Sequence, residues 1–214
     1  MLEVATRSAP GRGHPYQDRV LVDERRGLFA VADGVTRSSQ GDGAAGAELA
    51  VKLLSENFSG DLKRAVEEVH EMVFGKMRQE WSIGETTLTA MSVNDSQAEV
   101  CNVGDSPARL IQGANITDLY TVDKSMQGDL TQVIGFPESI KVHSTRFQIN
   151  NGDVIILATD GVDEVLHPPL IYRFLRKVNA KEIADAIIQG ARAQVRRGGY
   201  DDDKTVIVIR AQKT

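Results

Sequence analysis

The sequence holds a single cysteine, Cys101, and no long apolar run. One cysteine excludes a disulfide within the chain, which suits a reducing compartment. A membrane-spanning helix needs roughly 20 consecutive apolar residues, and no stretch of the sequence approaches that length. The N-terminal stretch "MLEVATRSAPGRG" also lacks the apolar segment of a signal peptide. We therefore expect a cytoplasmic protein without membrane attachment.

The sequence also has no excess of positive charge. The formal net charge is -5, and a nucleic-acid partner would need a basic surface to attract its phosphates. The hydrophobic fraction of 41% and the charged fraction of 26% are typical of a globular protein. A length of 214 residues fits one domain with a sizeable core. We predict a single domain over residues 1–214 that does not bind nucleic acid.

Short segments bounded by Gly, Asn, Asp or Ser predict a protein rich in strands. Several of them alternate apolar and polar residues, as antiparallel strands with one covered face do. The expected strands are residues 2–7, 19–23, 28–32, 86–93, 97–103, 108–112, 115–121, 142–149, 153–159 and 204–210.

Helical periodicity occurs in only a few segments. Residues 43–58 place their apolar side chains on one face, and Asp61 is a candidate N-cap for the next helix. A short helix is expected after His167, and Asn179 with Glu182 resembles a capping box before the last helix. Since strands cluster instead of alternating with helices, we predict an α+β fold. We expect a four-layer α-β-β-α sandwich of two antiparallel sheets flanked by antiparallel helices.

Acidic residues recur where expected strands begin or end. Asp and Gly are common turn residues, so any one of these positions has a simple reading as a turn. Together, carboxylates that converge on one rim repel each other unless a cation neutralises them. Oxygen ligands without a His or Cys cluster favour Mg²⁺ or Mn²⁺ over zinc. The residues are Asp18, Asp33 with Gly34, Asp105, Asp160 with Gly161, and Asp201, Asp202 and Asp203.

Five segments carry a resemblance to a known family. They are "QDRVLVDERRGLFAVADGV", "TTLTAMSV", "CNVGDSPARLI", "LATDGVDEVL" and "DDDKTVIVI". In order and spacing they resemble the metal-dependent protein phosphatases of type 2C, the PPM family, over residues 11–210. The resemblance implies the β-sandwich predicted above. It also implies hydrolysis of phosphoserine and phosphothreonine in proteins with two bridged Mg²⁺ or Mn²⁺ ions.

The resemblance also implies roles for the acidic residues. Asp33 matches the aspartate that bridges both ions, and Gly34 supplies a backbone carbonyl. Asp160 and Asp202 match ligands of the first ion, and Asp18 matches a residue that binds an ion directly or through water. Thr205 sets the register of the last strand, which leaves Asp201 and Asp203 as solvated turn residues.

A third, weaker ion is seen in some members of the family. Asp105 matches the residue that would join Asp160 at this ion. Asp105 has an alternative reading as a turn residue whose side chain caps backbone amides.

Other features depart from the family pattern. Arg12 and Arg37 are both candidates for binding the substrate phosphate, and either could instead be a solvated surface charge. His14 is a candidate general acid, with a surface-loop histidine as the alternative. The long flap segment of the family is reduced to a stub, "MQGDLTQVIGFPES", as in a compact bacterial-type member. We expect an open metal rim.

The sequence thus predicts an enzyme, a cytoplasmic and monomeric signalling phosphatase. Its partners would be phosphorylated proteins, the targets of a Ser/Thr kinase. Two alternatives remain. One is a stress-signalling phosphatase that acts on an anti-sigma antagonist. The other is a non-catalytic pseudophosphatase adaptor, which would be expected to lack the metal aspartates.

Overall fold

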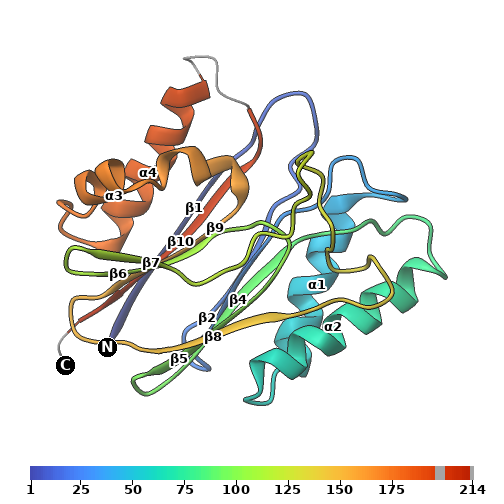
Figure 1. The fold of residues 1–214 in the computed structure, drawn as a ribbon, viewed down its shortest axis with the longest axis horizontal. Helices are drawn as coiled ribbons and strands as arrows, with labels where there is room; N and C mark the ends of the chain where they lie inside the picture. The colour runs from blue at the N-terminus through green and yellow to red at the C-terminus, as the bar shows by residue number, and fades with distance from the viewer. Residues whose placement is uncertain (196–200, 213–214) are drawn as a thin grey trace.

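Two antiparallel sheets of five strands each form the centre of the fold (Figure 1). The structure is a computed structural model that describes residues 1–195 and 201–212, without the side chain of Glu164. The first sheet has the strand order β1-β10-β9-β6-β7, and the second has the order β2-β3-β4-β5-β8. The strands of the first sheet are β1 (Leu2–Ala9), β6 (Ala108–Gln112), β7 (Asn115–Asp118), β9 (Val154–Ala158) and β10 (Lys204–Ala211). Those of the second are β2 (Arg19–Asp23), β3 (Leu28–Ala32), β4 (Leu88–Asn94), β5 (Gln97–Val103) and β8 (His143–Gln148).

Helices cover the outer face of each sheet. In Figure 1, α1 and α2 lie on the side of the second sheet, and α3 and α4 on the side of the first. This arrangement confirms the predicted four-layer sandwich. None of the helices in the described part of the chain is long and apolar enough to cross a membrane. The helices are α1 (Gly43–Asn57), α2 (Leu62–Met77), α3 (Pro168–Phe174) and α4 (Ala180–Val195), and a 3-10 helix, η1 (Asp160–Val165), follows β9.

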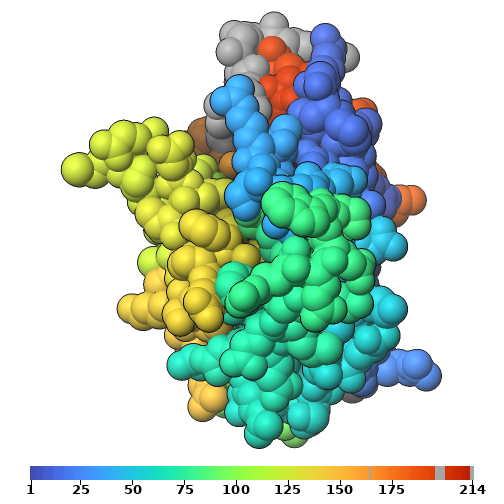
Figure 2. All heavy atoms as spheres, turned by 90° about the vertical axis from the view of Figure 1, so that its right-hand side faces the viewer, coloured from blue at the N-terminus to red at the C-terminus, as the bar shows by residue number. Residues whose placement is uncertain are grey.

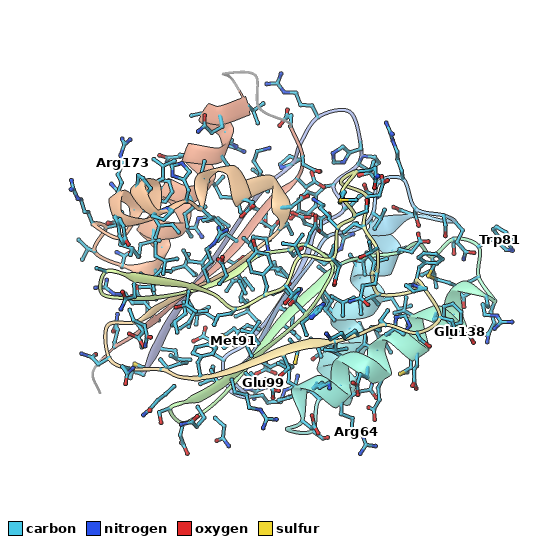
Figure 3. The ribbon with its side chains drawn as sticks, in the orientation of Figure 1. Arg64, Trp81, Met91, Glu99, Glu138 and Arg173 are labelled. Atoms are coloured by element: carbon cyan, nitrogen blue, oxygen red, sulfur yellow. The ribbon has the colours of Figure 1, made fainter. Side chains whose placement is uncertain are left out.

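The central strands are buried on both faces. In β3, Leu28 and Ala30 pack in the cluster under α1 and α2, while Phe29 packs between the sheets. In β10, Val206 packs under α4, and Ile207 packs between the sheets. Because successive side chains of a strand point to opposite faces, a strand covered on both sides reads as a continuous apolar run. Met91 of β4, labelled in Figure 3, is another buried side chain of the layer between the sheets.

The predicted helix caps are present. The Asp61 carboxylate accepts a hydrogen bond from the backbone N–H of Arg64, as expected for an N-cap. Asn179 Oδ1 accepts a hydrogen bond of 2.8 Å from the backbone N–H of Glu182. The Glu182 carboxylate, in return, accepts from the N–H of Val178, one residue before the position that a capping box uses.

Strand β4 begins at Leu88, two residues later than predicted. Thr86 and Thr87 leave the ladder and hold the backbone of Asp33 instead. The N–H of Thr87 donates to the carbonyl oxygen of Asp33 at 2.8 Å, and the Thr86 hydroxyl donates to the same oxygen at 2.8 Å. The polar start of the predicted strand therefore belongs to the site described next.

Candidate active site

The acidic residues found in the sequence lie at the same end of the two sheets. Asp33 follows the last residue of β3, and Asp18 precedes the first residue of β2. Arg19 of β2 pairs with Ala32 of β3 in the β-ladder. Asp18 and Asp33 therefore lie on neighbouring segments just beyond the end of this ladder. Asp105 lies in the connection from β5 to β6, Asp160 opens the 3-10 helix after β9, and Asp202 lies two residues before β10.

A pocket of about 630 Å³ opens at this end of the sandwich. Asp33, Asp105, Asp160 and Asp202 all line it, and so does Gly34. Asp18 is not among the lining residues, because it is fully buried beneath them. The structure thus brings together the carboxylates that the resemblance implied as ligands. The other lining residues are Val35, Thr36, Arg37, Ser39, Glu85, Thr87, Lys124, Gly128, Asp129, Leu130, Val133 and Phe136.

The carboxylates disturb each other's ionisation. Burial raises the pKa of Asp33 well above its ordinary value, and the negative charges of Asp18 and Asp160 raise it further. Burial also raises the pKa of Asp160 to about 7, with further contributions from Asp105 and Asp202. The pKa of Asp18 is raised to about 7, again mainly by burial and despite the hydroxyl hydrogen bonds it accepts. Without a bound metal ion, the negative charges of these carboxylates are therefore not fully neutralised.

The residues present fit a divalent cation of the Mg²⁺ or Mn²⁺ type. The donors are carboxylate oxygens, which such ions prefer. Oδ1 of Asp18 is buried and has no hydrogen-bond partner, although Oδ2 of the same carboxylate accepts from the Thr159 hydroxyl at 2.9 Å. A buried oxygen without a hydrogen-bond partner lowers the stability of the fold unless a ligand binds to it. Among residues 1–195 and 201–212, however, no three His, Cys, Asp or Glu side chains already enclose a single point.

The glycine that follows each key aspartate permits close approach of two backbones. A Cβ at Gly161 would overlap the backbone oxygen of Asp203, and a Cβ at Gly34 would overlap the backbone of Gly43. These contacts bring the segment before β10 next to Asp160, and the start of α1 next to Asp33. In both Asp-Gly pairs, the aspartate therefore lines the pocket and the glycine permits another backbone segment to pack closely.

The prediction for Asp203 as a solvated turn residue is wrong. Asp203 is buried, and its carboxylate accepts hydrogen bonds from the backbone N–H groups of Gly11 (2.7 Å) and Gln17 (2.6 Å). Asp201 is partly exposed and accepts from Lys204 Nζ at 3.0 Å. Of the three consecutive aspartates, only Asp202 lines the pocket, which agrees with the register set by Thr205.

The structure separates the two arginine candidates. Arg37 is exposed on the rim and lines the pocket. Arg12 lies outside it. Arg12 lines a second, smaller pocket of about 260 Å³ and pairs with Asp201 at 3.2 Å between Nε and Oδ2. Only Arg37 is therefore placed to reach a phosphate in the carboxylate pocket.

His14 is not a surface-loop histidine. Its side chain is only 10% exposed, and Nε2 lies 3.3 Å from Oδ1 of Asp202. The ring is nevertheless absent from the residues that line the pocket. His14 contacts Asp202 from outside the pocket, which does not favour its use as a general acid.

Sequence reasoning missed Lys124. This residue lies in the connection 119–142 between β7 and β8, which holds the shortened flap segment. Its ammonium group makes an ion pair with Asp105 and lies 3.5 Å from Oδ2 of Asp160. Burial lowers the pKa of Lys124, but its contact with Asp105 and the charges of both carboxylates outweigh burial and raise it. A lysine in a polar loop gives no signal of such a contact in the sequence.

The connection 119–142 forms one side of the pocket, with Leu130, Val133 and Phe136 as its apolar part. In Figure 2 this connection, coloured olive to yellow, lies beside the blue segment that follows β3. The stub expected from the sequence therefore supplies one side of the pocket.

Comparisons with known proteins indicate the family of the chain. The family model described as Stage II sporulation protein E (SpoIIE) matches residues 61–212. A curated relative, the serine/threonine phosphatase stp of Listeria monocytogenes, is 24% identical over 222 residues, which cover 87% of this chain and 85% of the relative.

Solved structures share the fold. The Mycobacterium tuberculosis serine/threonine phosphatase PstP/Ppp has a TM-score of 0.83 at 22% identity, with 99% of each chain covered. The catalytic domain of PstP in complex with two manganese ions has a TM-score of 0.81 at 22% identity, also with 99% of each chain covered. The family match spans most of the sequence, so the chain belongs to the SpoIIE family and with it to the PPM phosphatases.

Proposed function

We propose that this protein is a metal-dependent serine/threonine protein phosphatase. The observation that carries the proposal is the set of carboxylates at one pocket, with raised pKa values at Asp33 and Asp160. A structural turn has no need of several partly or fully buried carboxylates that repel each other, whereas a site for divalent cations does. The family membership indicates that the reaction at such a site is the hydrolysis of a phosphoprotein.

Asp33, Asp160 and Asp202 would hold two Mn²⁺ or Mg²⁺ ions, with the backbone carbonyl of Gly34 and with Asp18 beneath. When bound, such a pair of ions lowers the pKa of a water so that hydroxide is available near neutral pH. The protein's own part is to fix the carboxylates. Thr86 and Thr87 hold the backbone of Asp33, and Asp203 holds the loop that carries Asp18.

Arg37 would bind the phosphate of the substrate. Its guanidinium group is on the rim of the pocket, and a guanidinium forms paired hydrogen bonds with phosphate oxygens. Arg12 is the weaker candidate because it already pairs with Asp201 outside the pocket. Phosphoryl transfer depends mainly on positioning and on positive charge around the phosphate, which a nearby arginine supplies.

The substrates would be phosphoserine and phosphothreonine proteins, the targets of a Ser/Thr kinase. An open pocket at the end of the sandwich admits a side chain that projects from a protein surface. We propose that the enzyme acts as a monomer in the cytoplasm, and the single cysteine of the sequence suits such a reducing compartment.

Hydrolysis of a phosphoserine peptide with and without Mn²⁺ tests this function. We expect release of phosphate with Mn²⁺ or Mg²⁺ and loss of the activity in EDTA, restored when excess metal is added. Full activity in EDTA would disprove the metal-dependent mechanism. No activity with either metal, from protein that is shown to be folded, would favour the pseudophosphatase adaptor.

A second candidate is a stress-signalling phosphatase that acts on an anti-sigma antagonist. The match to a family described as a sporulation protein favours it, whereas the relatives from Listeria, named serine/threonine phosphatases, favour the first candidate. The two candidates share the chemistry and differ in the phosphoprotein. Parallel assays on a phosphorylated kinase and on a phosphorylated anti-sigma antagonist would separate them.

A further inference from the structure

The amino group of Lys124 lies between two carboxylates of the pocket. It makes an ion pair with Oδ2 of Asp105 and lies 3.5 Å from Oδ2 of Asp160. The Asp105 side chain is only 6% exposed, and Lys124 is about one-third exposed, at 35%. The contact is thus partly buried. Solvent screens an ion pair less there than at the open surface, so the attraction between the charges is stronger.

Asp105 and Asp160 form the pair at which the family resemblance allows a third metal ion. We propose that Lys124 is a built-in cation that takes the place of this third ion, so that the protein uses two metal ions and one lysine. The inference rests on the proposed two-metal function. It concerns only the Asp105 side of the pocket and leaves the ions at Asp33 unchanged.

The backbone carries Lys124 to this position. Asp123 and Gly104, the residues that precede Lys124 and Asp105, are joined in both directions. The N–H of Asp123 donates to the carbonyl of Gly104 at 3.1 Å, and the N–H of Gly104 donates to Oδ2 of Asp123 at 2.9 Å. Two adjacent residue pairs are therefore held side by side, which places the lysine next to Asp105.

Asp123 is itself held firmly. It is buried, and its Oδ1 lies 2.8 Å from Nε2 of His143 at the start of β8. Its Oδ2 also accepts a hydrogen bond of 2.8 Å from Gln132 Nε2. The lysine thus projects from a fixed backbone position, and little further backbone entropy is lost when its amino group pairs with the carboxylates.

A tethered ammonium differs from a metal ion in two ways. It is present at any concentration of free metal, and it fills the space between Asp105 and Asp160 that a hydrated ion would need, since Mg²⁺-type ions keep several waters. The contact uses Oδ2 of Asp160, so that Oδ1 stays available for an ion beside Asp33 and Asp202. One carboxylate can therefore serve both the lysine and a metal ion.

Counting bound metal tests the proposal. Mn²⁺ bound per chain is measured by equilibrium dialysis and metal analysis on the full chain, with crystals soaked in Mn²⁺ to locate each ion by anomalous scattering. We expect two ions in the wild type and none beside Asp105. In Lys124→Met, which keeps the length of the side chain without its charge, we expect a third ion beside Asp105 that binds more weakly than the other two.

Three further variants sharpen the result. Lys124→Arg keeps the positive charge and should bind two ions. Adding Asp105→Asn to Lys124→Met removes a ligand of the freed site and should return the count to two. Lys141→Met is the matched control, because Lys141 is an exposed lysine of the same connection, and it too should leave the count at two.

Three ions in the wild type, with density beside Asp105, would overturn the proposal while the two-metal function stands. A count of two in folded Lys124→Met, without density beside Asp105, would also overturn it. If Lys124→Met does not fold, the wild-type crystal alone decides, by the presence or absence of an ion beside Asp105. A wild type that binds no Mn²⁺ at all would instead disprove the proposed function, and this inference with it.

Discussion

The carboxylate of Asp203 accepts a hydrogen bond of 2.6 Å from the backbone N–H of Gln17, across 186 positions of the sequence. The same carboxylate binds the N–H of Gly11. One side chain before β10 thus holds both ends of the loop that leads to Asp18. The position of a candidate metal ligand at one end of the chain therefore depends on a residue near the other end.

Removal of this carboxylate should weaken both stability and activity. In Asp203→Ala the N–H groups of Gly11 and Gln17 lose their acceptor, and each unsatisfied buried group costs about 1–3 kcal/mol. We expect a lower free energy of unfolding in urea and a lower phosphatase rate. Asp203→Asn keeps one acceptor oxygen and should lose less. Equal stability of the wild type and the alanine variant would show that the loop is held by other contacts.

The acidic residues of the pocket should differ from their neighbours in their effect on the rate. Asp33→Ala and Asp160→Ala remove pocket carboxylates, and we expect each to lower the turnover of a phosphopeptide by orders of magnitude. Asp201→Ala, outside the pocket, should leave the turnover largely intact. The outcome that contradicts the register of β10 is an essential Asp201 together with a dispensable Asp202.

Gly161 should not tolerate alanine. Its missing Cβ leaves room for the backbone oxygen of Asp203, so that Gly161→Ala would push the start of β10 away from Asp160. We expect a lower melting temperature and weaker binding of Mn²⁺. Gly75→Ala in α2 is the matched control. A Cβ there meets nothing within 4 Å, and alanine is the better helix former by about 0.8–1.0 kcal/mol.

Cys101 should be inert toward thiol reagents in the folded protein. Burial, helped by the charge of Glu99, raises its pKa from 9.0 to about 12. A higher pKa means less thiolate. At pH 8 the thiolate fraction is roughly one in ten thousand in the folded protein and about one-tenth in the unfolded chain. Because it is the only cysteine, labelling with a chromogenic disulfide reagent at pH 8 should report unfolding directly. Rapid labelling without denaturant would refute this.

The fold was predictable from the sequence because its strands follow two clear patterns. Strands β3, β9 and β10 are buried on both faces and read as apolar runs, and strand β8 alternates between more and less exposed residues. Most helix and strand positions follow from these patterns and from caps such as Asp61. The errors lie at strand ends, where residues such as Thr86 leave the ladder for contacts with another segment.

The site was predictable only in part. Asp33 and Asp160 each follow an apolar run and precede a glycine, a local signal that survives in the sequence. Asp203 and Lys124 carry no such signal, because their partners lie far away along the chain or in a loop without regular structure. Among the three consecutive aspartates, the register of Thr205 selects Asp202, but only the tertiary contact with Gln17 shows that Asp203 is buried and holds a loop.

The pairing of β1 with β10 has a consequence for how the protein is made. β1 lies at the edge of its sheet, and its neighbour in that sheet is β10, with Leu2 opposite Ala211 and Ala9 opposite Lys204. During synthesis β1 therefore leaves the ribosome long before its partner exists. Contacts between residues so distant along the chain form late and slowly. The same last segment brings Asp202 and Asp203, so both the first sheet and the carboxylate pocket stay incomplete until the end of the chain has been made.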